Sequence, residues 1–136
     1  MKIGNALKIL FSAVAILGSL IPNSACAAAG DLYVAIGDAG SGAIVKFTPD
    51  GVGSIFASGL YPILGLAFDR QGNLLAVENF DGRILKFSAD GTESTFASGL
   101  SDPNGLAIDG NGNLFVTESF GDFGGITEFT PAGGRS

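Results

Sequence analysis

The sequence contains no His and no Trp, and it has one Cys and only seven Lys and Arg residues among its 136. The absence of His excludes imidazole acid–base catalysis, His-ligated zinc and lyase chemistry that depends on a His. A single Cys excludes an internal disulfide and a thiolate metal cluster. Because 13 acidic residues outnumber the basic ones, the clustered cations that nucleic-acid binding requires are missing and we expect no nucleic-acid partner. These absences remove several functions and select none.

What is present indicates a folded protein without helices. Hydrophobic residues make up 46% of the chain, 11 of them Phe, which excludes a disordered chain and allows one domain of ordinary size. Beyond Ala27, the apolar residues nowhere keep a helical period over a helix-length stretch. We therefore expect an all-β protein.

The segment 1–27 has the three parts of a secretory signal peptide. Lys2 and Lys8 precede an apolar run over 9–21, which ends at Pro22, and small residues follow up to Ala27. At about 1.5 Å per residue this run spans roughly 20 Å, short of the ~30 Å hydrocarbon core of a bilayer. We predict cleavage after Ala27, no membrane span in the mature chain, and a secreted or periplasmic, bacterial protein.

A lipoprotein is the alternative interpretation of the same segment. Cys26 would then be acylated as the new N-terminus, although Asn23 stands where such signals usually carry Leu. Cleavage after Ala27 instead discards the only Cys together with Lys2 and Lys8, while every acidic residue remains. The mature domain, residues 28–136, is then strongly acidic and needs no redox protection outside the cytosol.

The remaining chain repeats one unit about two and a half times. Four short blocks return in a fixed order at a spacing of roughly 40 residues, slightly more where a loop is longer. The clearest pairs are Gly72-Asn-Leu-Leu-Ala-Val77 with Gly112-Asn-Leu-Phe-Val-Thr117, and Ser54-Ile-Phe-Ala-Ser-Gly-Leu60 with Ser94-Thr-Phe-Ala-Ser-Gly-Leu100. Blocks rich in Val, Ile, Leu, Phe and Thr between Gly, Asp, Asn and Pro are typical of short strands joined by tight turns.

Four antiparallel strands in each repeat of this length are typical of one blade of a β-propeller. The repeats cover about 30–60, 61–100 and 101–136, and the predicted strands are 31–36, 43–48, 53–58, 64–68, 73–78, 83–88, 93–98, 104–108, 113–118 and 125–130. Apolar residues on both faces of the second strand favour stacked blades over a β-sandwich, which remains the alternative. The prediction is an incomplete propeller of about two and a half four-stranded blades.

One motif resembles a known group of propellers. Pro103-Asn-Gly-Leu-Ala-Ile-Asp109, followed by Asn111-Gly-Asn-Leu-Phe-Val116, resembles the NHL-repeat proteins. It is also similar to the six-bladed, TolB-like superfamily of gluconolactonase/regucalcin and strictosidine-synthase-like proteins. The resemblance covers nearly all of 30–133 and implies the fold. It does not imply one activity, because such blades serve enzymes and binding scaffolds alike.

The predicted blades are too few for a closed ring, since propellers typically have four to eight. Two unstacked end faces of roughly 300 Å² each would lie open, near the upper limit for a soluble monomer. We expect either missing downstream blades in a fragment of a longer propeller, or self-association of copies that completes the ring.

Strand direction sorts the loops onto two rims. The rim at which the first strand of each blade begins has loops of varied length and composition, so it is the more plausible ligand face. The opposite rim carries stereotyped Asp-Gly turns. The candidate ligand residues on the first rim are Asp38, Glu78, Phe80, Asp81, Asp102, Asn104, Glu118, Phe120 and Asp122.

Asn104 is the most specific of these candidates. In the lactonase-type relatives an Asn just before Gly-Leu ligates a divalent cation, so the resemblance implies Ca²⁺ or another divalent cation at Asn104. Leu64 occupies the equivalent position one blade earlier and cannot bind metal. The structural alternative is that Asn104 makes the Pro-Asn-Gly turn.

Two acids and two aromatic residues recur in register on the same rim. Glu78 and Glu118 are candidate general bases or ligands, or alternatively residues of a structural turn. Phe80 and Phe120 either line a pocket or pin a loop against the blade.

The resulting functional hypothesis is an exported, NHL-like propeller segment that acts as a binding or scaffold module for an unknown protein or small-molecule ligand. The alternative is a fragment of a metal-dependent lactone hydrolase of the gluconolactonase/regucalcin type, with Asn104 as one ligand. A remnant of a truncated gene without function is the third interpretation.

Overall fold

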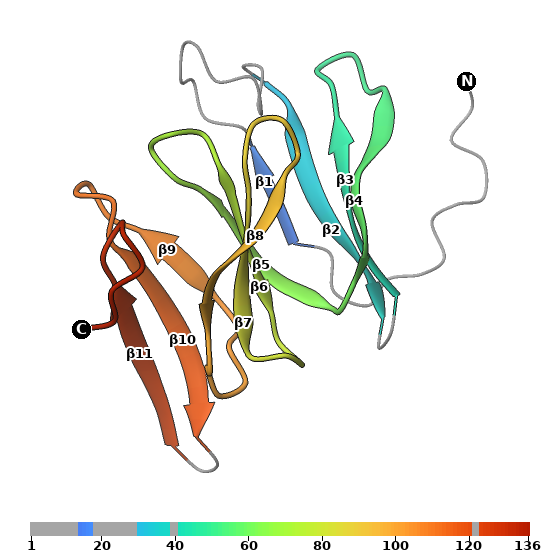
Figure 1. Ribbon diagram of the computed structural model, residues 1–136. Coiled ribbons are helices and arrows are strands. Elements are labelled where there is room, and N and C mark those ends of the chain that lie inside the picture. Colours follow the sequence, from blue (N-terminus) through green and yellow to red (C-terminus); the bar gives the residue numbers. More distant parts are fainter. Residues whose placement is uncertain (1–13, 18–29, 39–40, 121–122) are drawn as a thin grey trace.

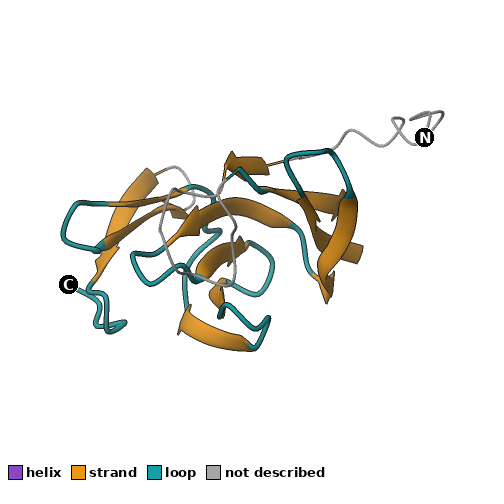
Figure 2. Ribbon diagram, turned by 90° about the horizontal axis from the view of Figure 1, so that it is seen from above, coloured by secondary structure: helices purple, strands orange, loops and turns teal. Residues whose placement is uncertain are grey.

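The computed structural model describes residues 14–17, 30–38, 41–120 and 123–136, which form strands and no helix (Figure 2). The strands are β1 (Val14–Leu17), β2 (Leu32–Asp38), β3 (Ser41–Phe47), β4 (Gly53–Leu60), β5 (Ile63–Phe68), β6 (Leu74–Glu78), β7 (Arg83–Phe87), β8 (Glu93–Ser98), β9 (Leu106–Ile108), β10 (Leu114–Phe120) and β11 (Phe123–Phe129). Within the described residues no helical segment has the length and hydropathy of a membrane span.

The strands form three separate antiparallel sheets that stand side by side (Figure 1). We call them blade 1 (β1-β2-β3-β4), blade 2 (β5-β6-β7-β8) and blade 3 (β9-β10-β11). The first strand of each blade lies innermost, since β5 contacts both β1 and β9. Sheets arranged with their first strands around a shared axis are the blades of a propeller, so the predicted fold class is confirmed and the two-layer sandwich is not found among the described strands.

The strand registers reproduce the sequence repeat. Leu74 pairs with Phe87 in blade 2, and the equivalent residues Leu114 and Phe129 pair in blade 3. The turns that precede these second strands need glycine, because Gly72 and Gly112 have φ values of 81° and 89°. Every predicted strand is present, with ends shifted by one or two residues in most cases.

Two hydrophobic clusters fill the spaces between the blades, and each draws on both neighbouring sheets. Between blades 1 and 2 lie residues such as Tyr33, Ile44 and Phe87, with edge-to-face ring pairs around Tyr33. Between blades 2 and 3 lie residues such as Ile84 and Val116. Blade 2 is therefore apolar on both faces, as expected for a blade with a neighbour on each side.

Two features differ from the sequence interpretation. Val14–Leu17, within the predicted signal peptide, pairs antiparallel with β2 as the innermost strand of blade 1. In blade 3 a single antiparallel bridge joins Arg135 to Phe129 at the outer edge of β11. The cleavage after Ala27 and the acylation of Cys26 concern residues outside the described part of the chain, and both stay predictions.

Candidate functional site

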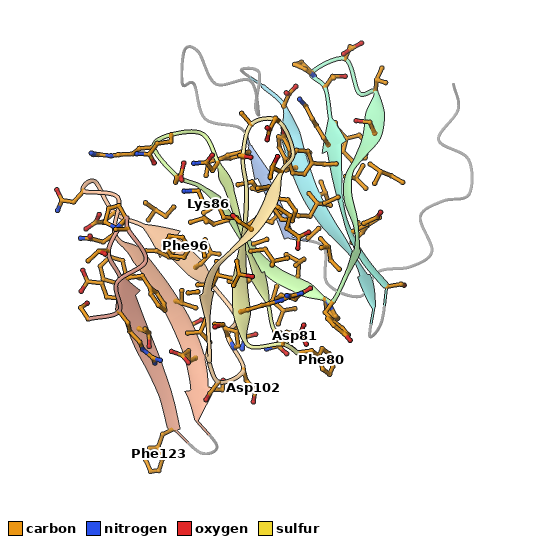
Figure 3. The ribbon with its side chains drawn as sticks, in the orientation of Figure 1. Phe80, Asp81, Lys86, Phe96, Asp102 and Phe123 are labelled. Carbon is orange, nitrogen blue, oxygen red and sulfur yellow. The ribbon has the colours of Figure 1, made fainter. Side chains whose placement is uncertain are left out.

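The loop rim is the edge formed by the turn 79–82, the segments 61–62 and 101–105, and the β10–β11 hairpin. Figure 3 shows Phe80, Asp81, Asp102 and Phe123 together at this lower edge of blades 2 and 3. The structure thus brings these rim residues to one side of the molecule. What each side chain can do there depends on its partners.

Glu78 does not face solvent on the rim but is completely buried. Its Oε1 accepts a hydrogen bond from the backbone N–H of Tyr61 at 2.7 Å, and its Oε2 accepts one from Nε of Arg83. This hydrogen bond raises the pKa of Arg83, which also lies 3.4 Å from Asp81. Because Tyr61 lies in the connection from β4 to β5, Glu78 fastens that connection between blades 1 and 2.

Glu118 performs the same task one blade later. It is 3% exposed, and its Oε2 accepts a hydrogen bond from the backbone N–H of Ser101 at 2.7 Å. Its Oε1 accepts hydrogen bonds from the hydroxyl of Thr127 and from Arg135, the latter at 3.2 Å. Both oxygens of each carboxylate are occupied, an arrangement that supports the structural alternative over proton transfer or ligand binding.

Asn104 lies exposed on the loop rim in a well-fixed turn. Its backbone N–H donates to the carbonyl of Thr117 at 2.9 Å, and its Nδ2 donates to the carbonyl of Asp102 at 3.1 Å. Asp102 has a φ of 42°, and Asn79 Nδ2 donates to the carbonyl of Pro103 at 2.9 Å. These contacts support the turn-forming role of the Pro-Asn-Gly segment.

The described residues do not assemble a divalent-cation site around Asn104. A tight site would draw several carboxylate or carbonyl oxygens together. Within the described part of the chain, no three His, Cys, Asp or Glu side chains lie close enough to hold a metal ion. The described residues thus show no assembled carboxylate site for the cation that the resemblance implies, and the divalent cation at Asn104 stays a prediction.

The remaining rim candidates are aromatic or lie at the limits of the described chain. Phe80 is 67% exposed and packs loosely beside Tyr61, with ring centroids 6.5 Å apart. The backbone of Asp38 ends β2 and that of Phe120 ends β10, and their side chains are outside the described residues, as is Asp122 altogether.

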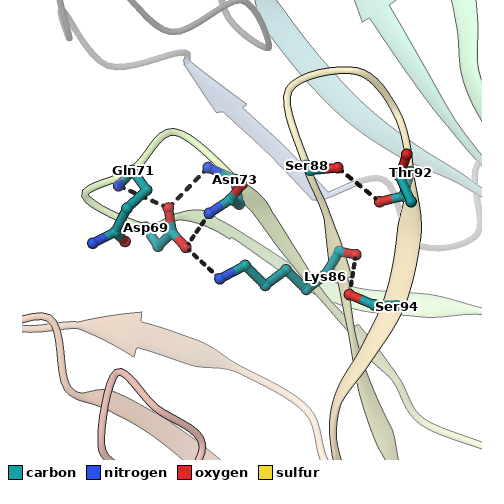
Figure 4. Close-up of polar contacts among 7 residues, drawn as sticks. All are labelled: Asp69, Gln71, Asn73, Lys86, Ser88, Thr92 and Ser94. Atoms are coloured by element: carbon teal, nitrogen blue, oxygen red, sulfur yellow. Dashed lines mark hydrogen bonds and ion pairs between the residues drawn. The ribbon is translucent and has the colours of Figure 1, made fainter.

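The opposite rim holds a repeated acidic turn that the sequence predicted only as a turn. Asp69 Oδ1 accepts hydrogen bonds from the N–H groups of Gln71 and Asn73, and its Oδ2 accepts one from Nδ2 of Asn73 at 2.7 Å (Figure 4). Lys86 reaches the same Oδ2 at 3.1 Å, and Lys46 likewise pairs with Asp31 at 2.8 Å. Lys46 and Lys86 occupy the same repeat position, and this recurrence is the sequence signal that could have predicted the two ion pairs.

A shallow cleft of about 140 Å³ also lies on this opposite rim, between blades 2 and 3. Its lining residues include Asp69, Arg70, Gln71, Phe96, Asn111 and Pro131. The sequence pattern favoured the other rim as the ligand face and did not indicate this cleft. It is small, because pockets that hold a drug-sized ligand usually enclose about 300 Å³ or more.

Comparison with known proteins supports the fold. No protein-family model and no curated protein matches the chain. A gluconolactonase candidate from structural genomics matches with 20% identity and a TM-score of 0.62, over 78% of this chain and 42% of that one. Regucalcin of Agrobacterium tumefaciens, described as a calcium-binding protein, matches with 16% identity and a TM-score of 0.66, over 78% and 40%.

A streptogramin B lyase matches with 21% identity and a TM-score of 0.66, over 91% of this chain and 44% of that one. The chain thus spans less than half the length of each of these three proteins. At such identities the likeness establishes the fold alone. It confirms the expected partial β-propeller, similar in structure to gluconolactonase and regucalcin.

Proposed function

We propose that this chain is part of an exported β-propeller that acts as a binding module, with the loop rim as its ligand face. The observation that carries the proposal is the pairing of exposed aromatic rings with unburied acids on that rim. Phe80 is 67% exposed beside Tyr61, and the side chain of the adjacent Asp81 is 40% exposed. Aromatic faces and carboxylates together favour an organic cation.

The buried acids support binding over catalysis. Glu78 and Glu118 were the candidate general bases, and each has both carboxylate oxygens in hydrogen bonds. A general base needs an oxygen within reach of the proton that it abstracts. With these oxygens engaged, the exposed groups of the rim are left to contact a ligand.

The test is a titration of the purified chain with tetramethylammonium, followed by amide chemical shifts. We expect shifts confined to 61–62, 79–82 and 101–105. Phe80→Ala and Asp81→Asn should each weaken binding several-fold. Glu93→Gln removes an exposed acid near the opposite rim and should leave binding unchanged. No shifts at the loop rim, or equal losses in all three variants, would reject the proposal.

A calcium-dependent lactone hydrolase is the second candidate, favoured by the structural likeness to a gluconolactonase candidate and to a calcium-binding protein. Asn104 is exposed on the loop rim and is the residue that would contribute to the cation site. Calorimetric titration with Ca²⁺ and a lactone-hydrolysis assay test this function. Calcium-dependent turnover that is lost in Asn104→Ala would replace the binding module by the hydrolase.

Export belongs to the same proposal and has its own test. The N-terminal sequence of the protein recovered from the periplasm or medium should begin at Ala28, so that the exported chain lacks Val14–Leu17 and blade 1 keeps β2, β3 and β4. A lipid-modified Cys26 at the N-terminus would assign a lipoprotein. An unprocessed chain in the cytosol would reject export without affecting the binding measurements.

A further inference from the structure

Blade 3 has one large face without a neighbour among the described residues. We call the side of a blade that turns toward the next blade along the chain its forward face, and the other side its rear face. Ile44, Ile84 and Ile126 occupy the same repeat position on the forward faces of the three blades. The first two are completely buried, whereas Ile126 is 70% exposed. The same apolar position is therefore covered twice and open once.

The forward face of blade 3 keeps the chemistry of a stacking surface. Phe115 occupies the position that Leu75 has in blade 2, and Leu75 is 2% exposed against blade 3. Leu75 and Ile84 are both members of the cluster that joins blades 2 and 3. The forward face of blade 3 is formed by the same apolar repeat positions, so it needs an apolar blade face to cover it.

The rear face of blade 1 is that kind of partner. Blade 3 packs on blade 2 through Leu114, Val116 and Phe129, with Leu114 opposite Phe129 across the sheet. Blade 1 carries Leu32 opposite Phe47 in the same register, together with Val34 in the place of Val116. These three residues of blade 1 are partly exposed. The rear face of blade 1 can thus sit on blade 3 as blade 3 sits on blade 2.

We propose that two copies of this chain associate head to tail, with the forward face of blade 3 in each copy docked on the rear face of blade 1 in the other. Such a heterologous contact made twice closes a ring. Three sheets per copy give six blades in all. The amount of chain also agrees with the three solved structures compared above, because one copy covers 40–44% of each, so two copies supply most of such a protein.

The buried area is sufficient for a stable dimer. From strand spacing and rise, a face of four five-residue strands measures roughly 300 Å², and the three strands of blade 3 give about three quarters of that. Two interfaces, each with one face of blade 1 and one of blade 3, remove roughly 1,000 Å² from water, about the area that a specific protein interface needs. A single such contact would bury only about half of that, so ring closure stabilises the assembly.

Sedimentation velocity and equilibrium of the purified full chain test the proposal. We expect a dimer at micromolar concentration. Ile126→Glu and Val34→Glu, one on each docking face, should each give a folded monomer, with the fold checked by circular dichroism. Val52→Glu is the matched control, because Val52 is 60% exposed in a turn away from both faces and Thr92 fills its place in blade 2.

Several results would overturn the proposed head-to-tail dimer. A monomeric wild-type chain would assign the open face to further blades of a longer chain. Oligomers that grow without limit as concentration rises would show that the contact does not close. An unchanged dimer in Ile126→Glu would place the interface elsewhere. None of these results depends on ligand binding at the loop rim.

Discussion

Blades 2 and 3 contain the same repeat in two different surroundings. Blade 2 has a neighbour on each face, and the apolar side chains of its strands are buried against those neighbours. Blade 3 has a neighbour on one face only within the described chain, and Ile126 is 70% exposed where Ile84 is buried. The carboxylate that fastens the blade to the preceding one is present in both, although its cation comes from Arg83 in one and from Arg135 in the other. We call this buried carboxylate, Glu78 or Glu118, with its hydrogen bonds the carboxylate latch. The latch recurs in both blades, whereas the burial of the isoleucine depends on the neighbouring blade.

The largest difference is expected from matched truncations of the two isoleucines. Ile84→Ala should lower the free energy of unfolding by about 3 kcal/mol, because it leaves a cavity in the cluster between blades 2 and 3. Ile126→Ala should change it by less than about 0.5 kcal/mol in the monomer, because the side chain is exposed. Urea unfolding at a concentration that keeps the chain monomeric measures both. Equal costs would mean that the two blades have similar surroundings.

The next largest effect concerns the carboxylate latch. Glu78→Ala leaves the N–H of Tyr61 without its acceptor and Arg83 without its main partner. We expect a loss of about 2 kcal/mol, because a hydrogen bond and an ion pair to a completely buried carboxylate are lost, while both donors stay partly exposed. Thermal unfolding monitored by circular dichroism measures the loss. Glu118→Ala should behave alike, and a neutral result for both would show that the latch does not stabilise the fold.

A smaller effect is expected at the lysine of the third strand. Lys86 pairs with Asp69 in blade 2, whereas Glu128 stands at the same position in blade 3, whose turn holds Asp109. Lys86→Ala should lower stability by about 0.5 kcal/mol, since the pair is partly exposed to solvent. Glu128→Lys should raise the melting temperature slightly by restoring the pair beside Asp109. A lower melting temperature for Glu128→Lys would show that the two turns are not equivalent.

The smallest effect is on pH dependence. The hydroxyl of Ser88 and the N–H of Thr92 donate hydrogen bonds to Asp90, which lower its pKa from 3.8 to about 2. Because the folded state has the lower pKa, this contribution to stability is present above pH 3.8 and is lost as the pH falls toward about 2. Carboxyl chemical shifts recorded against pH measure the pKa directly. A midpoint near 3.8 would contradict the capped turn.

Much of the fold could be predicted from the sequence because the repeat carries its own register. Gly72 and Gly112 mark turns that require a positive φ. The apolar strands that alternate with such turns define the blades. The site was harder, because burial is a tertiary property. Glu78 and Asp81 are three residues apart and both acidic, yet one is completely buried and the other exposed. Which acid turns inward depends on Tyr61 in the preceding connection, and no local pattern indicates that contact.

The strand Val14–Leu17 could not be predicted for a different reason. An apolar run preceded by Lys2 and Lys8 has the pattern of a leader, and the same apolar residues suit a strand. In the structure this strand pairs with the edge of β2, and cleavage after Ala27 would remove it, so the pairing leaves the leader a prediction. The C-terminal bridge of Arg135 to Phe129 follows a tight turn, in which the N–H of Thr130 donates to the carbonyl of Gly134 at 2.8 Å.

The stacking of blades as separate wedges around a common axis is the claim on which the fold, the loop rim and the dimer all depend. Methyl–methyl nuclear Overhauser effects in the selectively labelled chain test it most directly. We expect cross-peaks that join Ile84 of blade 2 to Val116 of blade 3, and none between Ile126 and any methyl of blade 2. Missing cross-peaks between Ile84 and Val116, or contacts from Ile126 to blade 2, would contradict the stacked arrangement.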